Sequence, residues 1–543
     1  MRNNALLISL PFITLLASAG GDPLLADDPH HVEPVVMSNP DVSFGPGATT
    51  IPVHGMRKGQ TNGPNHERPL KQLNNSNKGK PGGGGGGSAS DPVAQSEPFT
   101  SSAQVTANPT FEGLGDGFPP FSVDAAPPDT NGAAGATEYV QWVNESFAVF
   151  DKTGALKDGP VAGNELFQAL GANHPCAVNN DGDPIVAYDK VNNRWILTQF
   201  SVTNGASIGY WQCIAVSKTN DASGDFNVYA FRQPNFNDYP KFGVWNGVYY
   251  ATYNMFQGNT FVGARLCAYE GAAMRGGLSA QEQCFQLSKA YGGILPADVD
   301  GSNQPAAGAS EYFIGFGTDS LLTWRFHVNF GDSSNSTLSG PYTTPAPAFT
   351  EACGGGVCIP QPGTLEQLDS LGDRLMYRLS YRYFSDGHEA LFVNHSVNPG
   401  YVASGSRWYE LRPASDGTTG VTVHQASTYA PGDGLSRWMG AIASDKTGNL
   451  ALGYSGSSSS VYPSIFYSFR SPSDPLNKIG SERTLFVGTG SQKRNLDRWG
   501  DYSGMSIDPT DDCTFWYTNE YLATSGTFNW HTRIGSFKIS GCH

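Results

Sequence analysis

The sequence has few charged residues, and basic residues are scarcer than acidic ones. Aspartate, glutamate, lysine and arginine together make up 15% of the 543 residues. The 33 basic side chains stand against 48 acidic ones, which gives a formal net charge of −15 at pH 7. Binding to nucleic acid needs clustered lysine and arginine, so this composition argues against a nucleic-acid partner.

Long apolar segments are missing after the N-terminus, which argues against a membrane span. Arg2 precedes an apolar stretch over residues 5–16 that is too short to cross a bilayer, and the small residues Ala-Ser-Ala follow at 17–19. This pattern is typical of a secretory signal peptide, which we assign to residues 1–19. We expect a secreted protein, extracellular or periplasmic, without a lipid anchor.

Known catalytic and metal-binding signatures are also absent. The chain has no Ser-x-Asp-x-Gly-x-Thr-Trp box of sialidases and no His-Glu-x-x-His zinc motif. Cys353 and Cys358 lack the second nearby cysteine or histidine pair that a zinc site needs. We therefore expect no metal and no cofactor, with a structural Ca²⁺ bound by carboxylates as the alternative.

Turn-forming and aromatic residues, in contrast, are abundant. The chain holds 66 Gly, 36 Pro, 30 Phe, 24 Tyr and 10 Trp. Glycine supplies positive φ in tight turns, and aromatic side chains pack well on pleated surfaces. Because patterns typical of helices are few, the composition predicts an all-β chain of many short strands.

Eight cysteines fit a compartment in which disulfides form. Eight cysteines allow 105 pairings, and the sequence alone does not choose among them. We expect neighbours along the chain to pair, because every loop closed in this way is local. The expected pairs are Cys176 with Cys213, Cys267 with Cys284, Cys353 with Cys358, and Cys513 with Cys542.

Residues 20–114 show no pattern of a folded core. They include an Asn-rich stretch at 74–77 and a run of six glycines at 82–87. Such segments behave as flexible coil. We expect residues 20–114 to be a disordered pro-segment or a Gly-rich spacer, and residues 115–543 to form the folded domain.

A turn motif that contains Asp or Arg returns along the folded domain at intervals of roughly 55 to 75 residues. Each copy leads into a short strand of small and apolar residues, and further strands follow. Residues 375–382, for example, alternate between two faces as a strand does. The copies are 129–132, 181–184, 237–240, 295–298, 372–374, 436–438 and 498–501.

Seven such units of about four strands bury their faces by stacking around an axis, and closing the ring removes exposed sheet edges. The repeat therefore predicts a seven-bladed β-propeller, with six or eight blades as alternatives. A two-sheet sandwich would explain the strands but not the recurring turn motif.

Four stretches carry a resemblance to known proteins: 128–132, 139–144, 183–189 and 498–503. They resemble a group of large secreted bacterial proteins with propeller-like repeats. The resemblance covers most of residues 125–540. It implies a propeller fold and assigns no activity and no catalytic residue.

The first strand of each blade lines the channel of a propeller, so the turn motifs place polar groups near one mouth. Crowded carboxylates raise one another's pKa, which lets an acid and a base coexist. The alternative is structural, because Asp in a turn often caps backbone N–H groups. The aspartates concerned are Asp129, Asp183, Asp238, Asp298, Asp373 and Asp501. Among them, Asp373 and Asp501 are catalytic candidates, and Asp183 and Asp238 are candidates for substrate binding.

Three arginines lie on or next to expected inner strands: Arg378, Arg437 and Arg498. Arginine binds carboxylates through a planar fork, so these residues are candidates for binding an anionic sugar or a peptide carboxylate. The alternative is that each pairs with an Asp of a neighbouring blade. His395 and Tyr502 complete the catalytic candidates, as general bases.

We expect a carbohydrate-active enzyme, a polysaccharide hydrolase or lyase, that acts at the channel mouth as a monomer. The alternative is a non-catalytic propeller that binds an extracellular glycan or protein on the same face. Propellers host both kinds of function, so the fold does not decide between them.

Overall fold

The computed structural model describes residues 33–59, 64–69, 71–73, 90–414 and 420–543. Its regular structure is almost entirely β, which confirms the prediction of an all-β chain. No helix in these ranges is long and apolar enough to cross a membrane. The helices are short: α1 (Pro175–Val178), α2 (Gly205–Ile208), α3 (Gly271–Arg275) and the 3-10 helices η1 (Val53–Gly55), η2 (Gly163–Leu170), η3 (Ser333–Asn335) and η4 (Ala352–Gly355).

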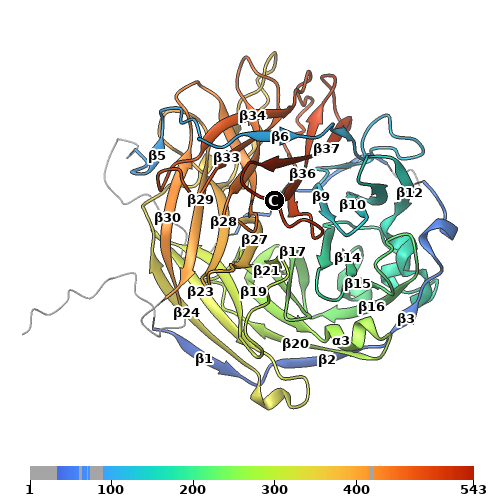
Figure 1. Cartoon of the computed structure of the whole chain (residues 1–543). Coiled ribbons are helices and arrows are strands. Elements are labelled where there is room, and N and C mark those ends of the chain that lie inside the picture. Colours follow the sequence, from blue (N-terminus) through green and yellow to red (C-terminus); the bar gives the residue numbers. More distant parts are fainter. Residues whose placement is uncertain (1–32, 60–63, 70, 74–89, 415–419) are drawn as a thin grey trace, which may run out of the picture.

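The strands form successive antiparallel meanders, each running outward from a common centre (Figure 1). The first meander is β9 (Asn131–Ala134), β10 (Glu138–Val143), β11 (Ser146–Asp151) and β12 (Leu156–Ala162). The second is β13 (Ile185–Asp189), β14 (Arg194–Ser201), β15 (Tyr210–Ser217) and β16 (Phe226–Gln233). The third is β17 (Phe236–Trp245), β18 (Val248–Gln257), β19 (Thr260–Tyr269) and β20 (Ala280–Gln286).

Four further meanders follow. They are β21 (Leu295–Asp300), β22 (Glu311–Gly317), β23 (Ser320–His327) and β24 (Thr337–Pro345); then β27 (Met376–Tyr383), β28 (Glu389–Val397), β29 (Gly405–Pro413) and β30 (Val421–Tyr429). Next come β31 (Ser436–Ser444), β32 (Leu450–Ser457), β33 (Ser464–Arg470) and β34 (Gly480–Phe486), and last β35 (Gly504–Ile507), β36 (Thr514–Leu522) and β37 (Trp530–Ile539). Two short pairs lie outside the meanders, β4 (His66–Glu67) with β8 (Ala125–Ala126) and β25 (Val357–Ile359) with β26 (Leu368–Asp369).

The first strand of each meander lies nearest the centre, as β9, β17, β21 and β27 show in Figure 1. Each of these inner strands contacts the next, and β35 of the last meander contacts β9 of the first. The inner strands β21 and β27 also pair with each other in parallel, with Ala297 opposite Leu379. The N-terminal ends of the inner strands therefore gather at one place.

Short strands before residue 115 add to the outer edges of the meanders. They are β1 (Val35–Ser38) on β24, β2 (Asp41–Gly45) on β20, β3 (Ala48–Thr49) on β16, β5 (Ala94–Gln95) on β30, and β6 (Val105–Ala107) with β7 (Phe111–Glu112) on β37. Pairing of this kind covers edges that would otherwise expose unpaired backbone groups. These strands differ from the disordered spacer that the sequence predicts, whereas the glycine run at 82–87 lies outside the described residues.

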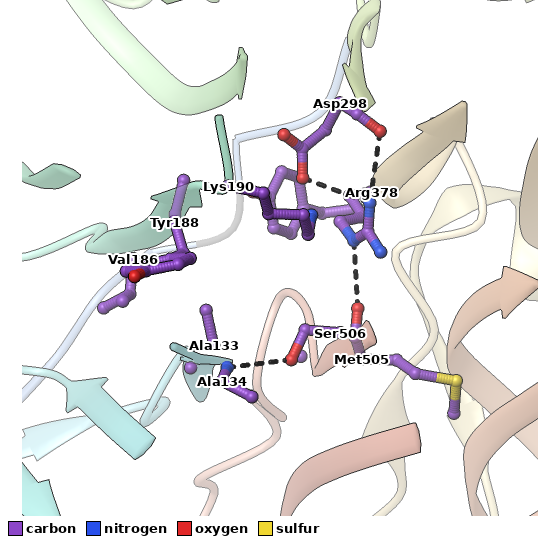
Figure 2. A pocket seen from close by; sticks show the side chains of 13 residues that line it. Ala133, Ala134, Val186, Tyr188, Lys190, Asp298, Arg378, Met505 and Ser506 are labelled. Atoms are coloured by element: carbon purple, nitrogen blue, oxygen red, sulfur yellow. Dashed lines mark hydrogen bonds and ion pairs between the residues drawn. The ribbon is translucent and has the colours of Figure 1, made fainter. Parts of the chain in front are cut away.

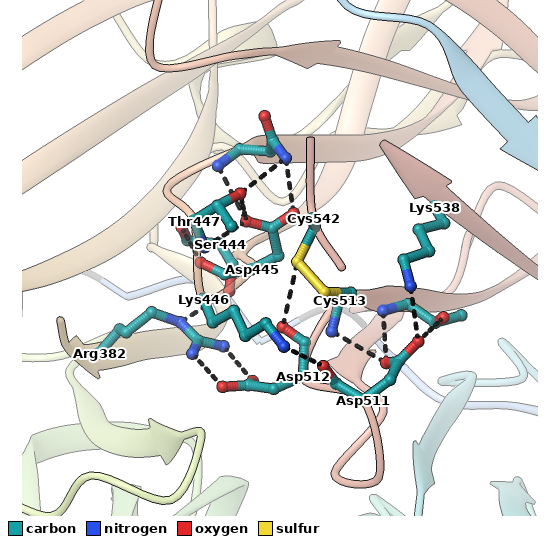
Figure 3. Close-up of a disulfide and its surroundings, with 12 residues drawn as sticks. Arg382, Ser444, Asp445, Lys446, Thr447, Asp511, Asp512, Cys513, Lys538 and Cys542 are labelled. Carbon is teal, nitrogen blue, oxygen red and sulfur yellow. Dashed lines mark hydrogen bonds and ion pairs between the residues drawn. A yellow bond between two sulfur atoms is a disulfide. The ribbon is translucent and has the colours of Figure 1, made fainter. Parts of the chain in front are cut away.

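All four expected disulfides are present, so the predicted pairing is confirmed. Figure 3 shows Cys513–Cys542, which joins the β35–β36 hairpin to the chain end beside an ion pair between Arg382 and Asp512. Both guanidinium nitrogens of that pair reach the carboxylate, at 2.7 and 2.8 Å. Because Arg382 belongs to β27, this contact ties the fifth meander to the last.

We predict that the described chain before residue 115 contributes to stability through the buried Val53 of η1. Val53 is fully buried in a hydrophobic cluster, whereas Ile51, two residues earlier, is 59% exposed. Val53→Ala should lower the free energy of unfolding by about 2 kcal/mol, because it leaves a cavity in the core. Ile51→Ala should change it by less than about 0.5 kcal/mol. Urea unfolding of both variants checks this, and equal midpoints would show that the segment lies loosely on the meanders.

Candidate active site

Four of the six aspartates that the turn motifs place at one mouth line a single pocket. These are Asp129, Asp183, Asp238 and Asp501, which stand at the N-terminal ends of β9, β13, β17 and β35. The pocket contains about 530 Å³ of empty space. The recurring motif thus brings together carboxyl groups that are far apart in the sequence.

The backbone at two of these aspartates is held in an unusual conformation. Asp129 and Asp183 both have φ of +48°, in the left-handed region that residues other than glycine seldom adopt. Asn144 fixes both of them: its amide nitrogen donates to Asp129 Oδ2 at 2.8 Å, and its oxygen accepts from the Asp183 N–H at 3.1 Å. Strain of this kind often marks sites where a side chain must keep one orientation.

Burial raises the pKa of three carboxyl groups in the pocket. The pKa of Asp129 lies well above its ordinary value because of burial and the nearby Asp501 and Asp183. Burial also raises the pKa of Asp183, against the effect of Arg68. For Asp238, burial and the neighbouring Asp183 raise the pKa to about 7. Asp238 can therefore hold a proton near neutral pH, as a general acid must.

Asp238 also differs from the other aspartates in its partners. Its side chain makes no hydrogen bond and no ion pair with any residue that the structure describes, although it is only partly exposed. Asp501, in contrast, accepts from Arg498 Nη2 at 2.5 Å. The pocket therefore combines a free carboxyl group with an ion-paired carboxylate.

Of the three arginines predicted from the sequence, Arg498 is the one that lines this pocket. Its Nη1 donates to Asp369 Oδ2 at 2.5 Å, its Nη2 to Asp501, and its Nε to the carbonyl of Arg68 at 2.9 Å. Each nitrogen of the guanidinium group thus donates to a protein group, so Arg498 holds the site together.

Part of the N-terminal chain forms one wall of the pocket. We call residues 64–73, without residue 70, the crossing segment; Arg68, Pro69 and Lys71 line the pocket. Arg374 Nη2 donates to the Lys71 carbonyl at 2.7 Å. The Leu73 N–H donates to Asp373 Oδ2 at 2.8 Å, and Arg68 forms an ion pair with Glu145. Asp373, predicted to be catalytic, therefore anchors this segment.

Tyr502, a predicted site residue, lies near the acidic groups together with Lys241, which the sequence analysis did not single out. The Lys241 ammonium sits over the rings of Tyr239 and Tyr502, 3.5 and 3.7 Å from their centroids. Burial lowers the pKa of Lys241 to about 7, against the attraction of Asp183 and other carboxylates. The Tyr502 hydroxyl donates to the Pro184 carbonyl at 3.0 Å and is fully buried.

Arg378 lies apart from the acidic pocket. It lines a second, smaller pocket with Lys190 and Asp298, as Figure 2 shows. Its Nη1 donates to Asp298 Oδ2 at 3.1 Å, its Nη2 pairs with Asp300, and its Nε donates to the Met505 carbonyl at 3.0 Å. These contacts join β27 to β21 and β35. Arg378 therefore has the structural pairing role that the sequence analysis gave as the alternative to ligand binding.

Two further candidates lie in the body of the meanders. Arg437 is fully buried and pairs with Asp433 and Glu482, both at 2.7 Å. His395 is buried on β28, where its Nε2 is 3.1 Å from the Tyr409 hydroxyl. Burial lowers the pKa of His395 well below its ordinary value. Neither residue lines the acidic pocket, so the structure places both outside the candidate site.

Three residues in or next to the pocket were not singled out by the sequence. Lys241 follows a turn motif directly, so the repeat itself carried a signal for it. Asn144 lies within a stretch of the family resemblance, but no role was assigned to it. Arg68 belongs to a segment without any strand pattern, and only its contacts reveal it.

The pocket does not supply a compact set of metal ligands. Within the described ranges, the only trio of potential ligand atoms closer than 4.8 Å to one another belongs to Cys267, Glu282 and Cys284. Two of these three residues form a disulfide. The structure therefore offers no ready ligand set for the Ca²⁺ that the sequence left as an alternative.

Comparison with known proteins gives limited information. No model of a protein family and no curated protein matches the sequence. Matching solved structures include an endo-arabinase from Bacteroides thetaiotaomicron (11% identity, 65% of this chain and 92% of that chain, TM-score 0.26). They also include an ulvan lyase (12%, 78% and 97%, 0.33) and an exo-β-1,3-galactanase from Clostridium thermocellum (10%, 66% and 81%, 0.31). At TM-scores this low, we base no argument on these alignments.

The raised pKa of Asp238 predicts a pH-dependent loss of stability. The folded protein keeps this proton up to about pH 7, whereas the unfolded chain releases it near pH 4. The folded state therefore binds more protons between these values, and the free energy of unfolding falls as pH rises through them. Asp238→Asn removes this effect.

The variant should match the wild type in urea unfolding at pH 4 and be more stable at pH 8. Asp116→Asn is the matched control, because Asp116 is exposed and lies outside the pocket. A stability difference that does not change with pH would contradict the assignment.

Proposed function

We propose that the meanders are the blades of a seven-bladed β-propeller. In support, β35 contacts β9, and each inner strand between them contacts the next. We also propose that the domain works outside the cytoplasm, since four disulfides persist most readily in an oxidising compartment. The described N-terminal strands then form an outer belt of the propeller rather than a spacer.

We propose that the protein hydrolyses a polysaccharide at the acidic pocket. The observation that carries this proposal is the unpaired Asp238 beside the ion-paired Asp501. Glycoside hydrolysis uses two carboxyl groups: one donates a proton to the leaving oxygen, and the other acts as base or nucleophile. Asp238 is the proton donor in this scheme, because its pKa is about 7. Asp501 supplies the carboxylate.

Asp129 and Lys241 support this chemistry at Asp238 and Asp501. Asp129 accepts the Asp501 N–H at 2.8 Å and so positions that residue. The Lys241 ammonium lies close enough to Asp183, Asp129 and Asp501 to interact with their charges. Such interactions are strong in surroundings of low dielectric constant.

Elimination, the reaction of a lyase, has less support. A lyase needs a Tyr or His base beside a cation that neutralises a uronate. Tyr502 is buried and its hydroxyl donates to a carbonyl, and His395 lies outside the pocket. Each nitrogen of the Arg498 guanidinium already donates to a protein group. We therefore favour hydrolysis.

A non-catalytic glycan-binding propeller is the second candidate. It is favoured by the complete pairing of the predicted arginines, since Arg378, Arg437 and Arg498 all bind carboxylates of the protein itself. A binding protein can use the same pocket with the crossing segment as a fixed wall. The unpaired Asp238 is the feature that this candidate leaves unexplained.

Screening the purified protein against neutral and uronic-acid polysaccharides tests the proposal. We predict new reducing ends without unsaturated products, and a rate that falls as pH rises above about 7, where Asp238 loses its proton. Asp238→Asn should lower kcat by at least about 100-fold. Asp116→Asn should leave it unchanged.

Unsaturated products would show that the protein is a lyase. Full turnover by the Asp238→Asn variant would place the chemistry elsewhere. Retained polysaccharide binding without turnover in the wild type would establish the second candidate.

A further inference from the structure

A third pocket, larger than the acidic pocket, lies between the outer parts of the fifth and sixth meanders. We call it the rim pocket; it contains about 900 Å³ of empty space and shares no residue with the acidic pocket. Its walls come from β28, β29, β30 and the loops that follow β27, β31 and β33. The residues used below are Phe384, His388, Glu410, Arg412, Lys446 and Arg470.

Arg470 is the most unusual residue of this pocket. Its side chain is almost entirely buried, since the residue is 3% exposed, yet it forms no ion pair with a carboxylate of the described chain. Its Nε donates to the Lys478 carbonyl at 3.0 Å and its Nη2 to the Asp474 carbonyl at 2.9 Å. The Asp474 carboxylate is engaged elsewhere, by Ser101, Ser102 and Ser471.

A buried guanidinium without an ionic partner is costly, so its position calls for a function. Three backbone carbonyls hold Arg470 in place through Nε and Nη2, the third being that of Pro475 at 3.5 Å from Nη2, and Nη1 makes no hydrogen bond within the described residues. Because Arg470 lines the pocket, this nitrogen is available to a ligand. A carboxylate or sulfate is the group that such a nitrogen binds best.

The charges around Arg470 also favour an anion. The lining residues include three permanent cations, Arg412, Arg470 and Lys446, against two carboxylates, Glu410 and Asp386. Glu410 Oε1 already accepts from Arg412 at 2.7 and 2.9 Å. The pocket is therefore positive in a chain whose net charge is −15.

An aromatic pair stands at the side of this positive pocket. The rings of Phe384 and His388 stack at 4.3 Å between centroids and 11° between planes. His388 is partly exposed, and its Nδ1 is fixed 2.5 Å from Asp386 Oδ1. The outer face of the pair offers a flat surface of the kind on which sugar rings pack.

From these contacts we infer that the rim pocket binds an acidic sugar residue, one that carries a carboxylate or a sulfate. Arg470 binds the anionic group, and the Phe384–His388 pair packs against the ring. The site would hold a polysaccharide away from the acidic pocket. The choice of a sugar rests in part on the proposed function, but binding here does not require catalysis at Asp238.

Calorimetric titration of the full chain with oligogalacturonate, a sulfated oligosaccharide and a neutral oligosaccharide of equal length tests this inference. We expect at least one acidic ligand to bind at least tenfold more tightly than the neutral one. The two acidic ligands distinguish a carboxylate site from a sulfate site. Failure of both to bind, or equal binding of all three, would overturn the inference.

Variants locate the binding. Arg470→Gln and His388→Ala should each weaken acidic-ligand binding at least fivefold. The second residue lies at the surface, so its replacement keeps the test valid if the first variant unfolds. Arg483→Gln is the matched control, because Arg483 lies outside the pocket and donates only to backbone carbonyls.

Asp238→Asn should leave binding at the rim pocket unchanged. This separates the inference from the proposed hydrolysis, which that variant abolishes. Binding that survives Arg470→Gln and His388→Ala, or that is lost in Asp238→Asn, would place the ligand elsewhere and refute the rim site.

Discussion

The Arg498 guanidinium connects three parts of the chain that lie far apart in the sequence. It pairs with Asp369 of β26 and with Asp501 before β35, and it donates to the Arg68 carbonyl of the crossing segment. Removing it would leave two buried carboxylates without their cation, which typically costs about 3 to 5 kcal/mol. Asp238 forms no ion pair within the described residues, and the charges of Arg374 and Lys71, which lower its pKa, do not outweigh its burial. The mouth therefore keeps one carboxyl group that can hold a proton up to about pH 7.

The ring of inner strands explains why the acidic groups gather in one place. Each turn motif lies just before an inner strand or at its start. The inner strands lie around a common centre (Figure 1), and each contacts the next. The outer strands are covered in turn by β1, β2, β3, β5 and β6 of the N-terminal chain. The same chain supplies Arg68 and Lys71 to the pocket wall. The N-terminal region therefore contributes both to the outer edges and to the candidate site.

The repeated turn motif allowed Asp183, Asp238, Asp501 and Arg498 to be assigned to one mouth, because motif position and strand order together determine that place. The disulfides were predictable because each joins cysteines that are neighbours along the chain and so closes a local loop. The side chains of Arg378, Arg437 and His395 were not predictable, because a shift of one residue along a strand moves a side chain to the opposite face. The belt strands have two to five residues each, too few to show alternation, and they pair with edges that only the folded structure provides.

The central claim is that the unpaired Asp238 marks the place where a polysaccharide is cleaved. A crystal structure of the inactive Asp238→Asn variant with the oligosaccharide that the wild type cleaves tests it most directly. We predict a sugar ring inside the acidic pocket, with the glycosidic oxygen within hydrogen-bond distance, about 3 Å, of the side chain at position 238. An oligosaccharide bound at another place would contradict the claim if the acidic pocket is empty and the crossing segment keeps its present position.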